Sequence, residues 1–260
     1  MFEKQAYARG VDKPATILGG PISPYVRKVL AVCDTKGITY RLDPIVPFFG
    51  SDTFSELSPL RRIPVFIDDQ VSIADSTVIC EYLEERYPSP RMMPKSPADR
   101  AHARFVEEVA DTRVADVFIW RIFNEAVINP FIWQRPRDKA SIQRAVDEAL
   151  PQVMDLLERL APADGFLFEL PGIADIAVAV AFANLGWARV TLDGARWPKT
   201  VAWTTRTRAL PALRETEQLG AKLMQTPPGE HRAALEAMGV PLTAATLATA
   251  EPRRGPMTSA

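Results

Sequence analysis

The chain has 260 residues, of which 47% are hydrophobic and 24% charged, values typical of a globular protein that exclude disorder for most of its length. Its 31 basic and 32 acidic side chains give a net charge of −1, without the basic excess of a nucleic-acid-binding protein. Two Cys and two His are too few for a disulfide framework or a closed zinc site, and no apolar run reaches the ~20 residues of a membrane span. The polar N-terminus lacks the apolar centre of a signal peptide, so we expect a cytoplasmic protein with no metal and no membrane or nucleic-acid partner.

The first predicted elements follow an irregular leader over residues 1–14. The apolar run at residues 15–18 stops at two glycines and a proline, which predicts a short strand. Ser23 followed by Pro24 is a strong signal for the start of a helix, and Gly37 marks its end.

Further strands are expected at residues 39–45, 64–67 and 71–74, with a weak helical stretch at 47–58. The last two strands form a tight hairpin by their spacing, and a helix over residues 76–87 follows Asp75. The order βαβ, loop, ββα predicts an α/β domain over residues 15–88, with a mixed four-stranded sheet and flanking helices.

The positions of the prolines indicate how the chain after the α/β domain is divided. Four of them crowd residues 88–97, so we interpret residues 89–97 as a linker. Apolar periodicity then predicts an all-helical domain over 98–225, with a nearly all-apolar central helix at 173–187. Residues 226–260 hold five prolines and many small residues, and we expect them to form a flexible, loosely attached tail.

Three segments of the α/β domain combine polar groups with chain turns. Ser23 lies at a helix N-terminus, where backbone N–H groups and the helix dipole favour an anion. Ile63–Pro64 opens a strand, and a cis bond there would aim the backbone of Ile63 outward for an extended ligand. Asp75 and Ser76 lie at a second helix N-terminus. Each segment also has an ordinary interpretation as a helix cap or a turn.

Taken in this order, the segments resemble the cytosolic glutathione transferase superfamily. Ser23-Pro24 is similar to the thiol-activating turn of its serine-type, bacterial-like members, and the stretch from Ser58-Pro59 to Pro64 is similar to its cis-proline turn. The helix at Asp75-Ser76 and the Pro-Gly-Ile-Ala-Asp-Ile-Ala segment at 171–177 resemble two further family motifs. The resemblance runs from about residue 15 to 223 and implies a thioredoxin-like N-terminal domain followed by an all-α domain.

The resemblance also implies a function, glutathione transfer, with glutathione as co-substrate. Ser23 would stabilise the glutathione thiolate, which is the nucleophile that attacks a hydrophobic electrophile. The glutathione-binding residues implied are Arg61, Arg62, Ile63, Pro64, Asp75 and Ser76. Arg61 and Arg62 would meet a carboxylate, although an adjacent pair of arginines can equally be a solvated surface feature.

The residues expected to line the electrophile pocket are apolar or aromatic: Ile22, Tyr25, Phe48, Phe49, Phe118, Trp120 and Phe123. Tyr25 is a rival to Ser23 for contact with the thiol, and aromatic residues at helical spacing are also common in cores. Two alternatives stay open: a glutathione-dependent lyase or ether-cleaving enzyme of aromatic catabolism, and a non-catalytic binding module of the same fold. A homodimer is implied by resemblance.

Overall fold

The computed structural model describes residues 13–255, so most of the expected leader and the last five residues of the expected tail lie outside it. Four strands form one mixed sheet in the order β2-β1-β3-β4. Strand β1 pairs parallel to β2 and antiparallel to β3, and β3 pairs antiparallel to β4. The predicted mixed four-stranded sheet is therefore confirmed, with these strand bounds: β1 Ala15–Leu18, β2 Tyr40–Asp43, β3 Val65–Ile67 and β4 Ser72–Ala74.

The helices of this N-terminal region begin at polar caps. Ser23 caps α1, Ser51 caps α2 and Asp75 caps α3, and Gly37 ends α1 in the left-handed conformation with φ of 68°. The helical elements are α1 Pro24–Lys36, η1 Pro47–Phe49, α2 Asp52–Leu57 and α3 Ser76–Arg86.

The region after residue 97 is all-helical, as predicted. Its first part is one continuous run that passes from an α-helix into a wide π-helical segment and back. The elements are α4 Pro97–Val109, η2 Ala110–Ile128, α5 Asn129–Ile132, α6 Lys139–Arg144, η3 Ala145–Ala149, α7 Leu150–Leu160, α8 Ile173–Trp187, α9 Pro198–Arg208 and α10 Pro211–Leu223.

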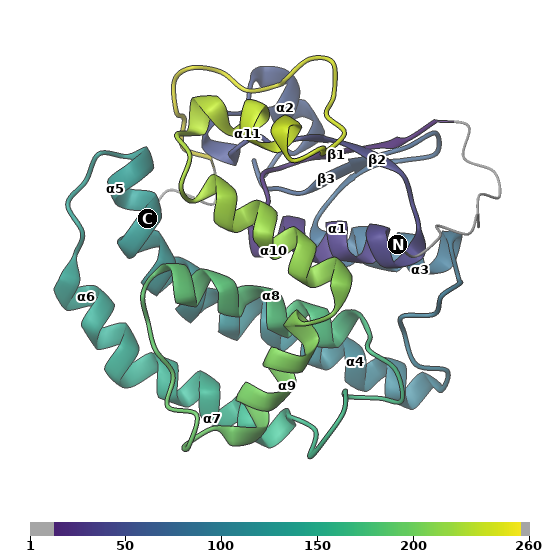
Figure 1. Cartoon of the computed structure of the whole chain (residues 1–260), viewed down its shortest axis with the longest axis vertical. Coiled ribbons are helices and arrows are strands. Elements are labelled where there is room, and N and C mark those ends of the chain that lie inside the picture. Colours follow the sequence, from purple (N-terminus) through teal and green to yellow (C-terminus); the bar gives the residue numbers. More distant parts are fainter. Residues whose placement is uncertain (1–12, 256–260) are drawn as a thin grey trace.

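Helix α8 is the centre of the molecule, as its apolar sequence predicts. It contacts α1, α4, η2, α9 and α10, and thus joins the two regions (Figure 1). Asp175 lies in the first turn of α8. Its buried carboxylate accepts hydrogen bonds from the backbone N–H groups of Gly172 and Leu167, each at 2.9 Å, and from the Trp203 indole at 2.6 Å. Gly172 as N-cap is therefore supported by the side chain of Asp175.

The chain after residue 225 differs from the flexible tail that the sequence suggested. It forms η4 (Pro228–Glu230) and α11 (His231–Ala237) and then follows the outer edge of β2, seen as the yellow segment over the sheet in Figure 1. Leu42 donates its N–H to the carbonyl of Pro241 at 2.9 Å and accepts from Thr243 at 3.1 Å. The pairing with β2 therefore uses the carbonyl of Pro241 and the N–H of Thr243.

Candidate functional site

The turn between β1 and α1 presents Ser23. Its backbone is extended, with φ of −69° and ψ of 128°, and its Oγ accepts the N–H of Val26 at 3.4 Å. Pro24 at the first helical position has no N–H to leave unpaired. The Ser23 side chain is half-buried, and its own hydroxyl hydrogen stays available to donate to a ligand.

Gly19, which sequence reasoning treated only as a strand stop, is required at the end of β1. Its φ of +138° suits glycine, and a Cβ there would lie 2.6 Å from the Val26 side chain and 2.9 Å from that of Ile63. The lack of a side chain therefore lets the Ile63 loop close against the start of α1. The Gly-Gly-Pro sequence was the signal that could have pointed to this close approach.

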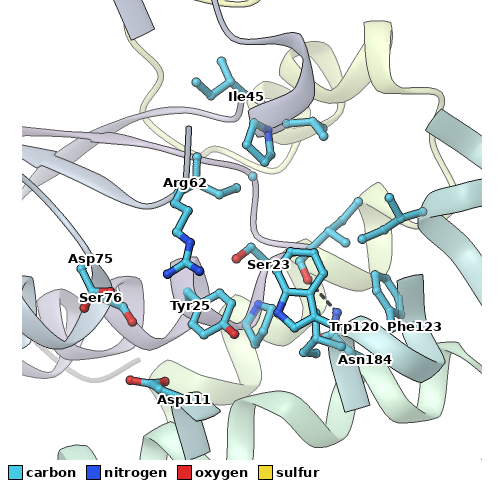
Figure 2. Close-up of a pocket in the computed structure, with 18 of the residues that line it drawn as sticks. Ser23, Tyr25, Ile45, Arg62, Asp75, Ser76, Asp111, Trp120, Phe123 and Asn184 are labelled. Carbon is cyan, nitrogen blue, oxygen red and sulfur yellow. Dashed lines mark hydrogen bonds between the residues drawn. The ribbon is translucent and has the colours of Figure 1, made fainter. Parts of the chain in front are cut away.

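The loop before β3 is organised by Ser58. Its buried hydroxyl donates to the carbonyl of Arg62 at 2.8 Å and accepts the N–H of Arg62 at 2.9 Å. The Ile63–Pro64 peptide bond is cis, the isomer that the sequence analysis considered for this turn. Arg62 itself is exposed, and its guanidinium points from this loop toward Tyr25 and Ser23 (Figure 2).

Arg61 is oriented differently from Arg62, although both arginines were expected to meet a carboxylate. Its guanidinium donates to Ser55 Oγ at 2.5 Å and to the carbonyls of Pro47 and Gly50 at 3.1 and 2.9 Å. These bonds tie η1 to α2 and use both terminal nitrogens of the guanidinium within the fold. Arg62 is therefore the arginine of the pair whose charge faces the cavity.

Asp75 and Ser76 lie at the N-terminus of α3. Asp75 has φ of 82°, and its carboxylate accepts the N–H groups of Thr77 and Val78 at 2.9 and 3.5 Å. Ser76 is buried. Both side chains face the same space as Arg62 and Tyr25, which come from different turns (Figure 2).

These turns open on one cavity of about 1200 Å³ between the sheet region and the helical region. Figure 2 shows Arg62, Asp75 and Ser76 on one side of it and Trp120 and Phe123 on the other, with Ser23 between them. The cavity thus has a polar half and an aromatic half that meet at the N-terminus of α1. Of the glutathione-binding residues expected from sequence, Arg61, Arg62, Ile63, Asp75 and Ser76 line it, whereas Pro64 is buried and does not.

The expected electrophile-pocket residues divide into two groups. Those that line the cavity are Ile22, Tyr25, Phe48, Trp120 and Phe123. Phe49 does not line it, because successive residues of a 3₁₀ turn point about 120° apart. Phe118 is a correction as well: it is buried in the core against Phe182, with ring centroids 5.2 Å apart.

Tyr25 has a hydroxyl that stays neutral. Burial, followed by the nearby carboxylate of Asp111, raises the pKa of Tyr25 above its usual value. The phenol can therefore donate a hydrogen bond but does not act as a base at neutral pH. Figure 2 shows Asp111 below Tyr25 and Ser76, a position that sequence reasoning missed because η2 lies far away in the chain.

A buried ion network, also missed from sequence, lies under the polar half of the cavity. Lys28 contacts Glu107 at 2.5 Å and Asp111 at 3.2 Å, and Thr77 donates to Asp111 at 2.6 Å. Burial opposes the charge on Lys28, but the carboxylates of Asp111 and Glu107 outweigh it and raise the pKa of Lys28. Burial raises the pKa of Glu107.

The described part of the chain has neither a metal-binding cluster nor a membrane-spanning helix. Within residues 13–255, no three His, Cys, Asp or Glu side chains are placed to hold a metal ion. No helix in the same part of the chain combines the length and apolar character needed to cross a bilayer.

Comparison with known proteins places these features in context. The family model for the glutathione S-transferase N-terminal domain matches residues 18–91. An uncharacterized GST-like protein, YibF, of Escherichia coli is 26% identical over 181 residues, which cover 67% of this chain and 83% of that protein. A stringent starvation protein A homolog of Haemophilus ducreyi is 39% identical over 80 residues, 31% of this chain and 37% of that protein.

Solved structures share the fold over most of the chain. A glutathione S-transferase from Sinorhizobium meliloti superposes with a TM-score of 0.71 at 21% identity, covering 85% of this chain and 99% of that one. One from Methylobacterium radiotolerans, solved in complex with glutathione sulfonate, superposes with a TM-score of 0.65 at 23% identity, covering 78% and 94%. At these identities the likeness shows the fold.

Proposed function

Since the chain belongs to the cytosolic glutathione transferase superfamily, we propose that it binds glutathione in the cavity between its two regions and activates the thiol at Ser23. The observation that carries the proposal is that Ser23, Arg62, Ile63, Asp75 and Ser76, from three separate turns, line one cavity. A thiolate at Ser23 would meet both a hydroxyl donor and the positive end of α1.

The polar half of the cavity suits the two charged ends of the tripeptide. Arg62 would offer a guanidinium to the glycine carboxylate, and the backbone of Ile63, which lines the cavity, would pair with the cysteinyl unit. Ser76 and the N-terminus of α3 suit the γ-glutamyl carboxylate, while Asp75 and Asp111 supply carboxylates for its ammonium group.

The aromatic half of the cavity suits a hydrophobic electrophile next to the sulfur. The thiolate attacks a carbon that bears a leaving group, the C–S bond forms, and the C–halogen or C–O bond breaks to release halide or phenolate. Trp120 and Phe123 would hold the aromatic part of such a substrate. Aryl halides and aryl ethers both fit this description, so the ether-cleaving alternative is an outcome of the substrate test.

The test combines binding and turnover. Glutathione binding is measured by calorimetry, and turnover with a panel of aryl halides, aryl ethers and thioethers. Ser23→Ala is expected to keep glutathione binding but to lose about 10²–10³-fold in kcat/KM, as when one stabilising donor is removed. Tyr25→Phe is the matched control for the rival hydroxyl, and an equal loss in it would transfer the role from Ser23.

Other results would overturn parts of the proposal. A wild-type protein that binds no glutathione would contradict it as a whole. Glutathione binding without turnover on any member of the panel would favour the non-catalytic module. Preference for ethers over halides would favour the ether-cleaving enzyme.

We also propose that the protein is a cytoplasmic homodimer. Val78 on α3 and Phe105 on α4 are about half exposed, at 50% and 52%, which gives the molecule an apolar surface at the outer rim of the cavity. Light scattering of the full chain tests the dimer, and a monomer at micromolar concentration would contradict it.

A further inference from the structure

Arg27 carries a buried charge whose hydrogen-bond partners in the described chain are all neutral oxygens. Its side chain is 1% exposed. Nη1 donates to the carbonyls of Pro21 at 2.7 Å and Ile22 at 2.9 Å, and Nη2 donates to the carbonyl of Val180 at 2.6 Å and to Asn184 Oδ1 at 2.5 Å. Burying a guanidinium without a carboxylate partner costs free energy, so stability alone does not explain why an arginine occupies this position.

The guanidinium is tied to the turn that carries Ser23. Two of its four bonds go to the residues immediately before Ser23, and Asn184 adds a third bond to the same turn by donating to the carbonyl of Ile22 at 3.0 Å. Covalent geometry then keeps the charge within about 8 Å of the Ser23 hydroxyl. Asn184 lines the cavity below Ser23, where Figure 2 shows its hydrogen bond as a dashed line.

Arg27 stays cationic at neutral pH despite its burial. Burial lowers the pKa of Arg27 to about 9, Arg208 adds to that effect, and Glu217 opposes it. Trp187 lies under the guanidinium at 4.7 Å, where the ring face also favours a cation. The charge is therefore present whenever glutathione would be bound.

Resting on the proposed function, we propose that the charge of Arg27 favours the thiolate form of glutathione at Ser23, which makes Arg27 a positioning residue for the reaction. The mechanism is electrostatic and acts through the turn, since the guanidinium faces the protein side of it. A unit charge about 10 Å from the sulfur, at an effective dielectric of about 20, shifts a thiol pKa by about one unit.

The other charged groups around the turn are largely balanced. On α1, Lys28 is paired with Glu107 of α4 and Asp111 of η2. Arg208 of α9 and Glu217 of α10 pair with each other at 2.5 Å. The remaining titratable groups that line the cavity are Tyr25, Arg61, Arg62, Asp75, Glu81, Arg104, Glu108 and His231. Arg62 is exposed to solvent, so its effect on the sulfur is screened more strongly than that of Arg27.

The experiment titrates the thiol of glutathione bound to the full chain, followed by the ultraviolet absorbance of the thiolate. Arg27→Gln removes the charge and keeps an amide donor, and it is expected to raise the bound thiol pKa by about one unit, which is a tenfold fall in the ionisation constant of the thiol. Arg27→Lys keeps a charge without the planar fork, and its thiol pKa should stay within about 0.3 units of wild type. A merely structural role predicts the same pKa in all three proteins.

A second pair of variants covers the case in which Arg27→Gln does not fold. Asn184→Asp sets a carboxylate against the guanidinium and neutralises its field, while Asn184→Ala removes the same hydrogen bond to Ile22 without adding charge. The thiol pKa is expected to rise in Asn184→Asp and to change little in Asn184→Ala.

The outcomes separate this inference from the proposed function. A wild-type protein that binds glutathione, with thiol pKa values equal in Asn184→Asp and Asn184→Ala, would overturn the role of Arg27 and leave the function standing. So would a rise in Arg27→Lys as large as that in Arg27→Gln. A wild-type protein that binds no glutathione would overturn both.

Discussion

At the scale of single residues, burial decides which reactive-looking groups can react. Cys33 and Cys80 are the two cysteines of the chain, and both are fully buried. Burial raises the pKa of Cys33 well above its usual value and that of Cys80 to about 12. A sulfur nucleophile at this site would therefore have to arrive with a ligand.

Both thiols are expected to be unreactive toward an aromatic disulfide reagent in the native protein at pH 8, because the reactive thiolate is suppressed and access is blocked. In denaturant, two thiols per chain should react. The raised folded-state pKa also means that the free energy of unfolding should fall as pH rises above about 8.5, where unfolded thiols ionise. Labelling of native protein at the rate of free cysteine would contradict this expectation.

At the scale of elements, α11 and the segment after it stabilise the sheet edge and one wall of the cavity. Asp43 at the end of β2 is 1% exposed, and it accepts from Arg232 at 3.1 Å and from the N–H of Leu247 at 2.7 Å. Farther on, the N–H of Arg253 donates to the carbonyl of Phe48 at 2.7 Å, and Arg254 lies over Trp133 at 4.7 Å. The segment thus covers an edge strand and holds η1, whose Phe48 faces the cavity.

Arg232→Ala should lower the free energy of unfolding by about 2 kcal/mol, because it removes a charged hydrogen-bond partner from the buried carboxylate of Asp43. Arg253→Ala is the matched control: its ion pair with Asp52 is largely exposed, so a loss under about 1 kcal/mol is expected. Urea unfolding of the full chain measures both. Equal losses in the two variants would show that Asp43 does not depend on Arg232.

At the scale of the whole molecule, α1 joins the two regions through its charged side chains as well as its apolar face. Arg27 bonds to the backbone of Val180 and the side chain of Asn184 on α8, while Lys28 reaches Glu107 on α4 and Asp111 on η2. Both cations are 1% exposed. The cavity lies between the two regions that these contacts join.

Lys28→Met should destabilise the protein by about 3–5 kcal/mol, because it leaves the buried carboxylate of Glu107 without a countercharge beside Asp111. Adding Glu107→Leu should restore much of the loss, since an apolar pair of similar volume can replace a buried ion pair. Thermal and urea unfolding of the single and double variants test this coupling. A double variant that is less stable than Lys28→Met would contradict it.

Local signals in the sequence determined the sheet, the capped helices and the apolar helix α8, because caps, turns and hydrophobic periodicity act within a few residues. They also pointed to Ser23, Arg62 and Asp75. Only the tertiary structure decided that Arg61 serves the fold while Arg62 faces the cavity, that Phe118 is core, and that the proline-rich tail covers β2. These outcomes depend on contacts between segments far apart in the chain, which periodicity and composition do not encode. The roles of Arg27 and Lys28 could not be predicted from the sequence either, because they depend on which groups are buried around the two charges.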